Sequence, residues 1–324
     1  MLGLIHEKEG LIMDGNNRGH PWWDDRVELT KTTAVSFDES IFATPKSIYN
    51  YFDSKIYGCD EYKKKMSVAI WSSLHHDIKS NFLVIGESGC GKTELARVLK
   101  EIYPNTAIFD ASNASPKAFK GNNSLSDCLL SVDTTQKPWV FIDEFDKCIL
   151  KGSNVGSMMA DEILKLAEGA QIYVGEDKQR KLVDTSLVNC VFLGSFSELK
   201  KNREVNIGFC SSGNSISKDS PIIRTDILAS GILSNEFLGR MNFGIIQLPS
   251  MTPNVAKEIL KDARYSPVTR LAKQYGISIS IHPNHIEELA NMTPEYGVRG
   301  IYSELQERIC NALFEDSETT TIEL

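Results

Sequence analysis

The sequence lacks the features that mark secreted and membrane-spanning proteins. Its seven cysteines are scattered and form no C-x-x-C pair, so it predicts neither a disulfide framework nor a cysteine-ligated zinc site. No apolar run approaches the ~18 residues of a membrane span. Charged residues such as Glu7 and Lys8 stand where a secretory signal needs an apolar core. We therefore expect a reduced, cytoplasmic protein with no membrane partner.

The sequence is also short of positive charge. Lysine and arginine total 35 against 43 aspartates and glutamates, which gives a net charge of −8. A protein that coats duplex DNA neutralises phosphates with a basic face, so a nucleic-acid partner is not expected. The 324 residues, 41% of them hydrophobic, fit a globular chain of two domains at about 150 residues each.

Short apolar runs alternate with helical patterns over most of the chain. Continuous apolar runs separated by helices predict parallel strands covered on both faces, hence an α/β fold with a sheet sandwiched by helices. The runs are residues 82–85, 107–109, 140–142, 190–193 and 244–248. We expect an N-terminal arm at 1–42, a large domain at 43–249, a hinge near Pro249, and a small, mainly helical domain at 250–324 with one late β-branched stretch at 319–322.

A phosphate-binding motif follows the first apolar run. Residues 86–93 read GESGCGKT and fit G-x-x-x-x-G-K-[ST], between a predicted strand and a helix that ends before Pro104. Backbone N–H groups of the loop and the helix N-terminus would hold the phosphates, with Lys92 at the β and γ phosphates and the Thr93 hydroxyl on Mg²⁺. The expected ATP contacts in and beside the loop are Gly86, Glu87, Ser88, Gly89, Cys90, Gly91, Lys92, Thr93 and Glu94.

A pair of acids ends the third apolar run. Asp143 and Glu144 follow residues 139–142 directly, which places them at the carboxyl edge of the sheet, where α/β folds bind ligands. We expect Asp143 to bind Mg²⁺ and Glu144 to deprotonate the attacking water. A lone D-E pair also caps helices, but together with the phosphate loop it favours a nucleotide hydrolase.

From about Thr44 to Leu324 the chain resembles the AAA+ superfamily, in particular the Clp/Hsp100 group and its ClpX family of protein unfoldases. The motif FIDEFDK at 141–147, LKLAEG at 164–169, EFLGR at 236–240 and GVRG at 297–300 carry the resemblance. It implies a P-loop AAA+ module with a small helical domain, and adenine contacts at Ile56 and Tyr57. It also implies that Arg240 reaches a neighbouring subunit's γ-phosphate and that Arg299 senses nucleotide in its own subunit. Together these imply a homo-oligomeric ring, usually of six subunits.

Two loops match ClpX segments that act on proteins. Residues 110–121 align with the first pore loop, which implies that Phe119, Lys120 and Gly121 contact a translocating polypeptide; Lys120 stands where the family has an aliphatic residue. Ile207, Gly208 and Phe209 match the tripeptide that docks on a ClpP-type peptidase.

The sequence also departs from that family. We expect the short arm to stand in place of the cysteine zinc domain. Sensor 1 offers only Ser195 as a polar group for the attacking water. Cys90 is either an oxidisable thiol beside the phosphates or, as we favour, a variable loop position filled by cysteine.

Two functions follow from these observations. The first is an ATP-dependent unfoldase that threads protein substrates through a hexameric pore and either feeds a ClpP-type peptidase or simply remodels the substrate. The alternative is a partner-specific remodelling or scaffolding ATPase without a peptidase, for example in a mobile-element or defence system, which the unusual arm with Trp22 and Trp23 motivates.

Overall fold

The computed structural model describes residues 38–114, 124–149, 154–175, 180–197, 199 and 221–324. The chain divides into two units, Met1–Ala34 and Val35–Leu324, and every described residue belongs to the second.

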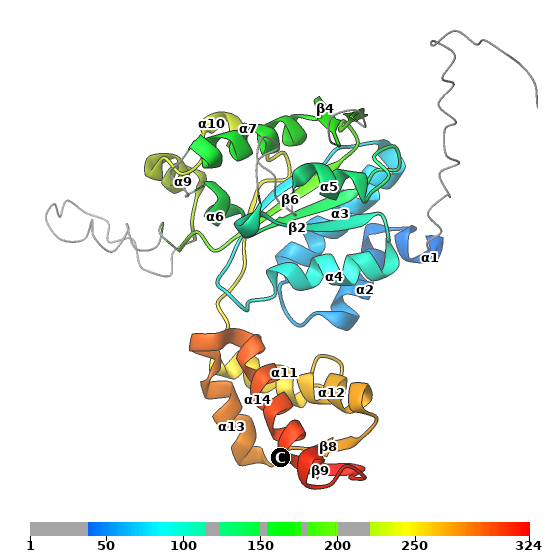
Figure 1. Ribbon diagram of the computed structural model, residues 1–324, viewed down its shortest axis with the longest axis vertical. Helices are drawn as coiled ribbons and strands as arrows, with labels where there is room; N and C mark the ends of the chain where they lie inside the picture. Colours follow the sequence, from blue (N-terminus) through cyan, green and yellow to red (C-terminus); the bar gives the residue numbers. More distant parts are fainter. Residues whose placement is uncertain (1–37, 115–123, 150–153, 176–179, 198, 200–220) are drawn as a thin grey trace, which may run out of the picture. The chain divides into compact units, whose positions relative to one another are not determined.

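Parallel strands form the central sheet of the described chain, in the order β2-β3-β6-β1-β7 (Figure 1). These strands are β1 (Asn81–Ile85), β2 (Thr106–Asp110), β3 (Trp139–Asp143), β6 (Asn189–Gly194) and β7 (Ile245–Gln247). All residues of β1 and β6 are buried, as continuous apolar runs require. The five runs expected to form parallel strands are thereby confirmed, and their carboxyl ends lie at one edge.

Helices cover both faces of this sheet, and alternate residues of each strand face opposite layers. Phe82 and Val84 of β1 pack with one layer, Leu83 and Ile85 with the other. The first layer is α2 (Pro45–Lys55), α3 (Asp60–His76) and α4 (Lys92–Ile102), with the short α1 (Glu39–Phe42). The second is α5 (Leu125–Leu130), α6 (Phe145–Ile149), α7 (Asn154–Glu168), α9 (Arg224–Ser230) and α10 (Asn235–Gly239).

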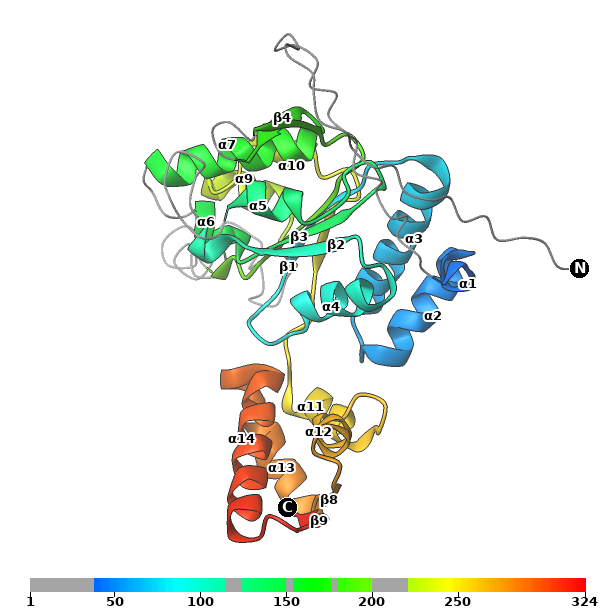
Figure 2. The same cartoon turned by 45° about the vertical axis from the view of Figure 1, so that its right-hand side comes forward.

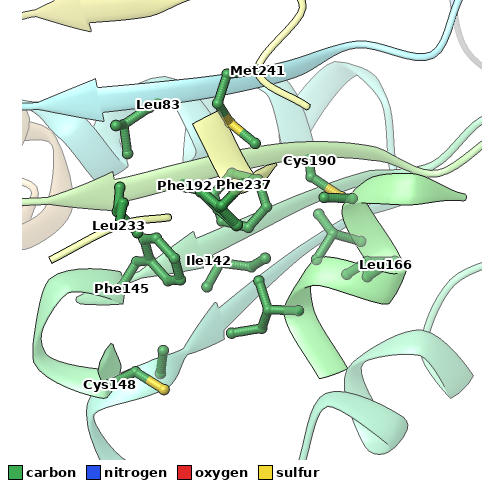
Figure 3. Packing of buried hydrophobic residues seen from close by; sticks show 14 of the residues in the cluster. Leu83, Ile142, Phe145, Cys148, Leu166, Cys190, Phe192, Leu233, Phe237 and Met241 are labelled. Carbon is green, nitrogen blue, oxygen red and sulfur yellow. The ribbon is translucent and has the colours of Figure 1, made fainter. Parts of the chain in front are cut away.

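An aromatic cluster lies at the centre of the second layer (Figure 3). The rings of Phe145, Phe192 and Phe237 lie with centroids 5.0–5.1 Å apart, and each side chain is nearly inaccessible to solvent. Phe145 begins α6 immediately after Glu144, so this packing fixes the backbone that follows the acid pair.

The C-terminal elements, coloured yellow to red in Figure 2, are helices and two short strands. Their buried residues form an apolar core of their own. These elements are α11 (Pro253–Lys261), α12 (Pro267–Tyr275), β8 (Ser278–Ser280), α13 (Pro283–Asn291), α14 (Thr293–Glu315) and β9 (Thr321–Glu323). α11, α12 and α13 each begin with proline after a polar cap, respectively Thr252, Ser266 and His282, because proline suits the first helical turn. The mainly helical C-terminal region is confirmed.

Three details refine the sequence-based expectations. The late β-branched stretch forms β9, but its parallel partner β8 was not predicted, since its pattern is short and largely exposed. The arm was expected to run to residue 42, yet Phe42 is buried in the first helical layer and the unit begins at Val35. A hairpin of β4 (Gln171–Val174) and β5 (Lys181–Asp184) follows α7. The hinge near Pro249 stays a prediction.

Candidate nucleotide site

The phosphate loop joins β1 to α4. Gly89 and Gly91 have φ of +77° and +94°, a left-handed backbone that glycine adopts without strain. Lys92 begins α4, and its Nζ donates hydrogen bonds to the carbonyl oxygens of Gly86 (2.6 Å) and Glu87 (2.7 Å). The ammonium group is therefore held over the loop that it closes.

A hydrogen bond joins the loop to the acid pair of β3. Thr93 Oγ1 donates to Asp143 Oδ2 at 2.7 Å, although the two residues are 50 positions apart, and Asp143 Oδ1 accepts the N–H of Glu144 at 3.0 Å. A hydroxyl beside a carboxylate is a set of hard oxygen donors of the kind that Mg²⁺ prefers. This arrangement fits the expected Mg²⁺ contacts. We call Lys92, Thr93, Asp143 and Glu144 the sheet edge.

Glu144 has a strained backbone. Its φ is +54°, an unusual value for a residue with a side chain, of the kind that clusters at functional sites. Its carboxylate pairs with Lys147 Nζ at 2.6 Å, and the hydrogen bond to Glu144 raises the pKa of Lys147. The pair is half-exposed, so it contributes only about 0–1 kcal/mol and opens readily.

Ser195 lies at the end of β6, but its hydroxyl is already bonded. Its Oγ donates to Asp146 Oδ2 at 2.7 Å, and that oxygen also accepts the backbone N–H groups of Ser195 (3.1 Å) and Phe196 (2.8 Å). Asp146 is 2% exposed. Sequence reasoning passed over this aspartate, though its place in FIDEFDK was a usable signal. The contact ties the β6 terminus to α6.

The expected adenine contacts line the other end of the pocket. Ile56 is buried, and Tyr57 makes an edge-on ring contact with Tyr265, with centroids 5.5 Å apart. Tyr265 comes from the C-terminal elements, and its hydroxyl donates to the carbonyl oxygen of Asp53 at 2.6 Å. An aromatic, partly apolar end is suited to a flat base.

A second contact from the C-terminal elements ends at the phosphate-loop helix. Arg270 Nη1 donates to Glu94 Oε1 at 2.8 Å, and its Nη2 donates to the carbonyl oxygen of Lys55 at 3.1 Å. Glu94, which was expected to bind nucleotide, therefore forms ion pairs with two arginines. The second is Arg97, whose Nη1 lies 3.3 Å from Glu94 Oε2. No local motif pointed to Arg270, because its partner is 176 residues away.

The GVRG segment lies against the phosphate loop. Gly297 has φ +62° and ψ −162°, and a Cβ built on it would lie 2.7 Å from Gly89 Cα. Only glycine permits so close a backbone approach in that conformation. Val298 and Arg299 follow and line the same pocket. We call Tyr265, Arg270, Arg299 and Tyr302 with their neighbours the C-terminal wall.

Arg240 lies elsewhere. Its carbonyl oxygen accepts a hydrogen bond from Asn81 Nδ2 at 3.0 Å, and Asn81 begins β1 whereas the phosphate loop follows its last residue, Ile85. A five-residue strand separates these ends by about 13 Å. The structure therefore brings Arg299 to the pocket of its own chain and leaves Arg240 at the opposite edge of the sheet, beside Glu168.

The comparisons with known proteins agree with this geometry. Residues 82–207 match the AAA family, described as the ATPase family associated with various cellular activities. The chain carries an AAA ATPase domain. It is thus an ATP hydrolase, with the α/β fold and C-terminal helical region that such a module carries.

The chain is also similar to the ClpX subunits of several bacteria. It is 29% identical over 309 residues to the "ATP-dependent Clp protease ATP-binding subunit ClpX 2" of Wolinella succinogenes, covering 84% of this chain and 77% of that protein. It is 26% identical to the ClpX subunit of Bacteroides fragilis, covering 84% and 76%, and 25% identical to that of Borrelia duttonii, covering 84% and 74%. These are distant homologues.

Two cysteines line the pocket of this ATPase without reactive surroundings. Burial raises the pKa of Cys59 to about 11 and also raises the pKa of Cys90 above its ordinary value. Both thiols are therefore protonated at neutral pH, which favours the interpretation of Cys90 as a filled loop position.

Several expected features have no structural test here. Phe119, Lys120 and Gly121 of the pore loop and Ile207, Gly208 and Phe209 of the docking loop lie outside the described residues. Within the described ranges, no group of three or more His, Cys, Asp or Glu side chains could hold a metal ion, and His282 caps α13. No described helix combines the length and apolarity needed to span a bilayer.

Proposed function

We propose that this AAA ATPase is a cytoplasmic protein unfoldase that couples ATP hydrolysis to the threading of polypeptides through a hexameric ring. The observation that carries the proposal is the bond between Thr93 and Asp143 beside Lys92 and Glu144. Its extension to unfolding rests on similarity to ClpX subunits over 84% of the chain. The described cysteines are all free, which supports a reducing compartment.

The sheet edge supplies the groups for hydrolysis. Lys92 and the N–H groups of residues 86–91 bind the ATP phosphates, with charge-assisted hydrogen bonds that the helix N-terminus reinforces. Thr93 and Asp143 hold Mg²⁺, which neutralises phosphate charge when bound. Glu144, released from Lys147, accepts a proton from the attacking water on a carboxylate oxygen.

The C-terminal wall supplies binding together with Ile56 and Tyr57, which come from the segment between α2 and α3. Ile56, Tyr57 and Tyr265 enclose the adenine, and Arg299 lies where it can contact the phosphates from the C-terminal elements. Because this wall comes from a separate core, nucleotide binding and loss would change its contacts with the sheet edge. That coupling converts hydrolysis into motion.

Arg240 acts on a neighbouring subunit. It lies too far from its own phosphate loop to serve there, so it contributes to hydrolysis only if a second subunit brings its nucleotide to this edge of the sheet. An arginine supplied in this way accelerates hydrolysis by roughly 10³–10⁵-fold. A closed ring gives every site one such arginine.

Replacement of the pore-loop aromatic tests the threading step. We expect Phe119→Ala to hydrolyse ATP yet fail to unfold a tagged fluorescent protein, with Phe119→Tyr as the control that keeps an aromatic ring. Unfolding at the normal rate by Phe119→Ala would contradict threading.

Deletion of residues 207–209 tests the peptidase partner. If a co-purifying peptidase is lost, the docking function is supported. An unchanged set of partners favours the partner-specific remodelling ATPase instead.

A further inference from the structure

The side chain of Arg240 is held by one carboxylate in its own subunit. Arg240 Nη2 donates to Glu168 Oε1 at 2.7 Å, and the two side chains are 46% and 29% exposed. Glu168 is the last residue of α7, and Arg240 is the C-cap of α10, so the pair joins two helices that are 72 residues apart in sequence.

Buried polar groups fix the backbone under both residues. Asn81 Nδ2 donates to the carbonyl oxygens of Ala167 (2.9 Å) and Arg240 (3.0 Å), and Asn81 is 3% exposed. Lys79 Nζ donates to the carbonyl oxygen of Leu166 at 2.9 Å and to that of Thr185 at 2.8 Å. Residues at one end of the sheet therefore fix the backbone positions of Glu168 and Arg240. The ion pair fixes the direction in which the Arg240 guanidinium points.

The ion pair leaves most of the guanidinium available. An arginine has five N–H donors, and within the described residues the Glu168 carboxylate is the single partner found for the Arg240 side chain. One edge of the planar group is thus anchored while other donors stay free for an anion. A pair this exposed contributes little to stability, so its value lies in orientation.

We propose that Glu168 is a positioning residue for Arg240: it orients the guanidinium toward the phosphates of the neighbouring subunit's nucleotide. This inference rests on the proposed role of Arg240 between subunits. It assigns to the end of α7 a part in hydrolysis at a site on another chain. The hairpin β4–β5 begins at Gln171, three residues after Glu168. The turn that carries Glu168, the partner of Arg240, therefore leads directly into that hairpin.

The test compares Glu168→Gln with Asp161→Asn, which removes the same charge from an exposed position on α7. For the assembled ATPase we expect Glu168→Gln to lower kcat about 10-fold with KM for ATP within twofold, because a misplaced group near the reacting atoms loses rate rather than binding. Glu168→Asp should regain part of the rate. Asp161→Asn should keep the normal kcat, and neither substitution should change the melting temperature. An unaltered or raised kcat in Glu168→Gln would overturn the inference.

Mixed assemblies distinguish positioning across subunits from a structural role. Glu168→Gln subunits keep their own Glu144, and Glu144→Gln subunits keep an intact Glu168 and Arg240. Mixing the two should raise turnover per intact site above that of Glu168→Gln alone. Turnover that only averages the two parents would show that Glu168 acts within its own subunit and would overturn the inference.

Arg240→Ala separates this inference from the proposed function. If Arg240→Ala keeps full kcat, the role of Arg240 between subunits fails and Glu168 has nothing to position. If Arg240→Ala is inactive while Glu168→Gln is normal, only the role of Glu168 fails.

Discussion

On the sheet edge of the nucleotide pocket, functional groups bond within the sheet and the helices that pack on it. On the C-terminal wall, functional groups instead bond to residues of the first helical layer, which has a different core. Thr93 bonds to Asp143 at the ends of elements fixed by buried strands. Arg270 of α12 bonds to Glu94, and Tyr265 of the turn before α12 bonds to the carbonyl oxygen of Asp53; both belong to the C-terminal region, which has a separate core.

This difference indicates which side of the pocket suits the chemical step and which side suits movement. A rigid edge suits groups that must meet a transition state at defined distances, since small displacements lose rate. A wall joined by a few partly exposed contacts can separate at low cost, which suits the binding and release of nucleotide. Substitutions at the acid pair should therefore lower turnover, and those on the wall should lower ATP affinity. Replacement of Lys92, which binds the phosphates, should lower both.

Lys92→Ala should have the largest effect, because it removes the positive charge over the phosphate loop. We expect ATP affinity to fall about 100-fold or more and hydrolysis to be lost, as when a charged partner of a buried group is deleted. Calorimetric titration with a non-hydrolysable ATP analogue measures the affinity. Lys100→Ala, on the exposed last turn of the same helix, is the matched control and should bind normally.

Gly297→Ala should cause the second-largest loss, and the quantity that falls is ATP affinity. Its Cβ would lie 2.7 Å from Gly89 Cα in a conformation that side chains avoid, which costs about 1–3 kcal/mol, or roughly 5- to 150-fold in affinity. Gly276→Ala has a similar positive φ of +70° but open space around it. It should lower stability without weakening ATP binding; equal losses of affinity would contradict a specific contact with the phosphate loop.

Arg270→Ala should have a smaller effect. The pair with Glu94 is partly exposed, so we expect ATP affinity to fall about three- to tenfold with kcat little changed. Glu94→Ala combined with Arg270→Ala should be no weaker than Arg270→Ala alone if the two residues act as a pair. Arg97→Ala, which removes the other partner of Glu94, should have less effect.

The thiols should show the smallest change. With a pKa of about 11, Cys59 has roughly one thiolate in 3,000 at pH 7.5, and alkylation speeds up only as pH rises toward that pKa. Brief iodoacetamide treatment at pH 7.5 should modify the exposed Cys310 and leave Cys59, Cys90 and ATP hydrolysis intact. Peptide mapping checks this, and rapid labelling of Cys90 would contradict the closed loop.

The sheet and its edge could be predicted from sequence because short, contiguous patterns of residues determine them. Continuous apolar runs mark the strands, and the phosphate loop and acid pair are contiguous motifs that follow two of them. Their meeting, seen in the bond between Thr93 and Asp143, follows from the rule that parallel strands place their carboxyl ends together.

The C-terminal wall could not be predicted in the same way. Arg270 bonds to Glu94, which is 176 residues away in sequence, and no pattern in the residues around Arg270 predicts that contact. Ser195 was predicted as the polar group of sensor 1 for the attacking water, but its bond to Asp146 depends on how α6 packs. Such contacts arise from tertiary packing, which local patterns do not encode.

The central claim is that the sheet edge performs hydrolysis with Glu144 as the base, and the most direct measurement is ATP binding and turnover by Glu144→Gln on one preparation. We predict that turnover falls at least 100-fold while ATP affinity stays within about twofold, since amide and carboxylate are similar in size but only the carboxylate accepts the proton. Turnover near the normal rate, or a parallel loss of affinity, would contradict the account.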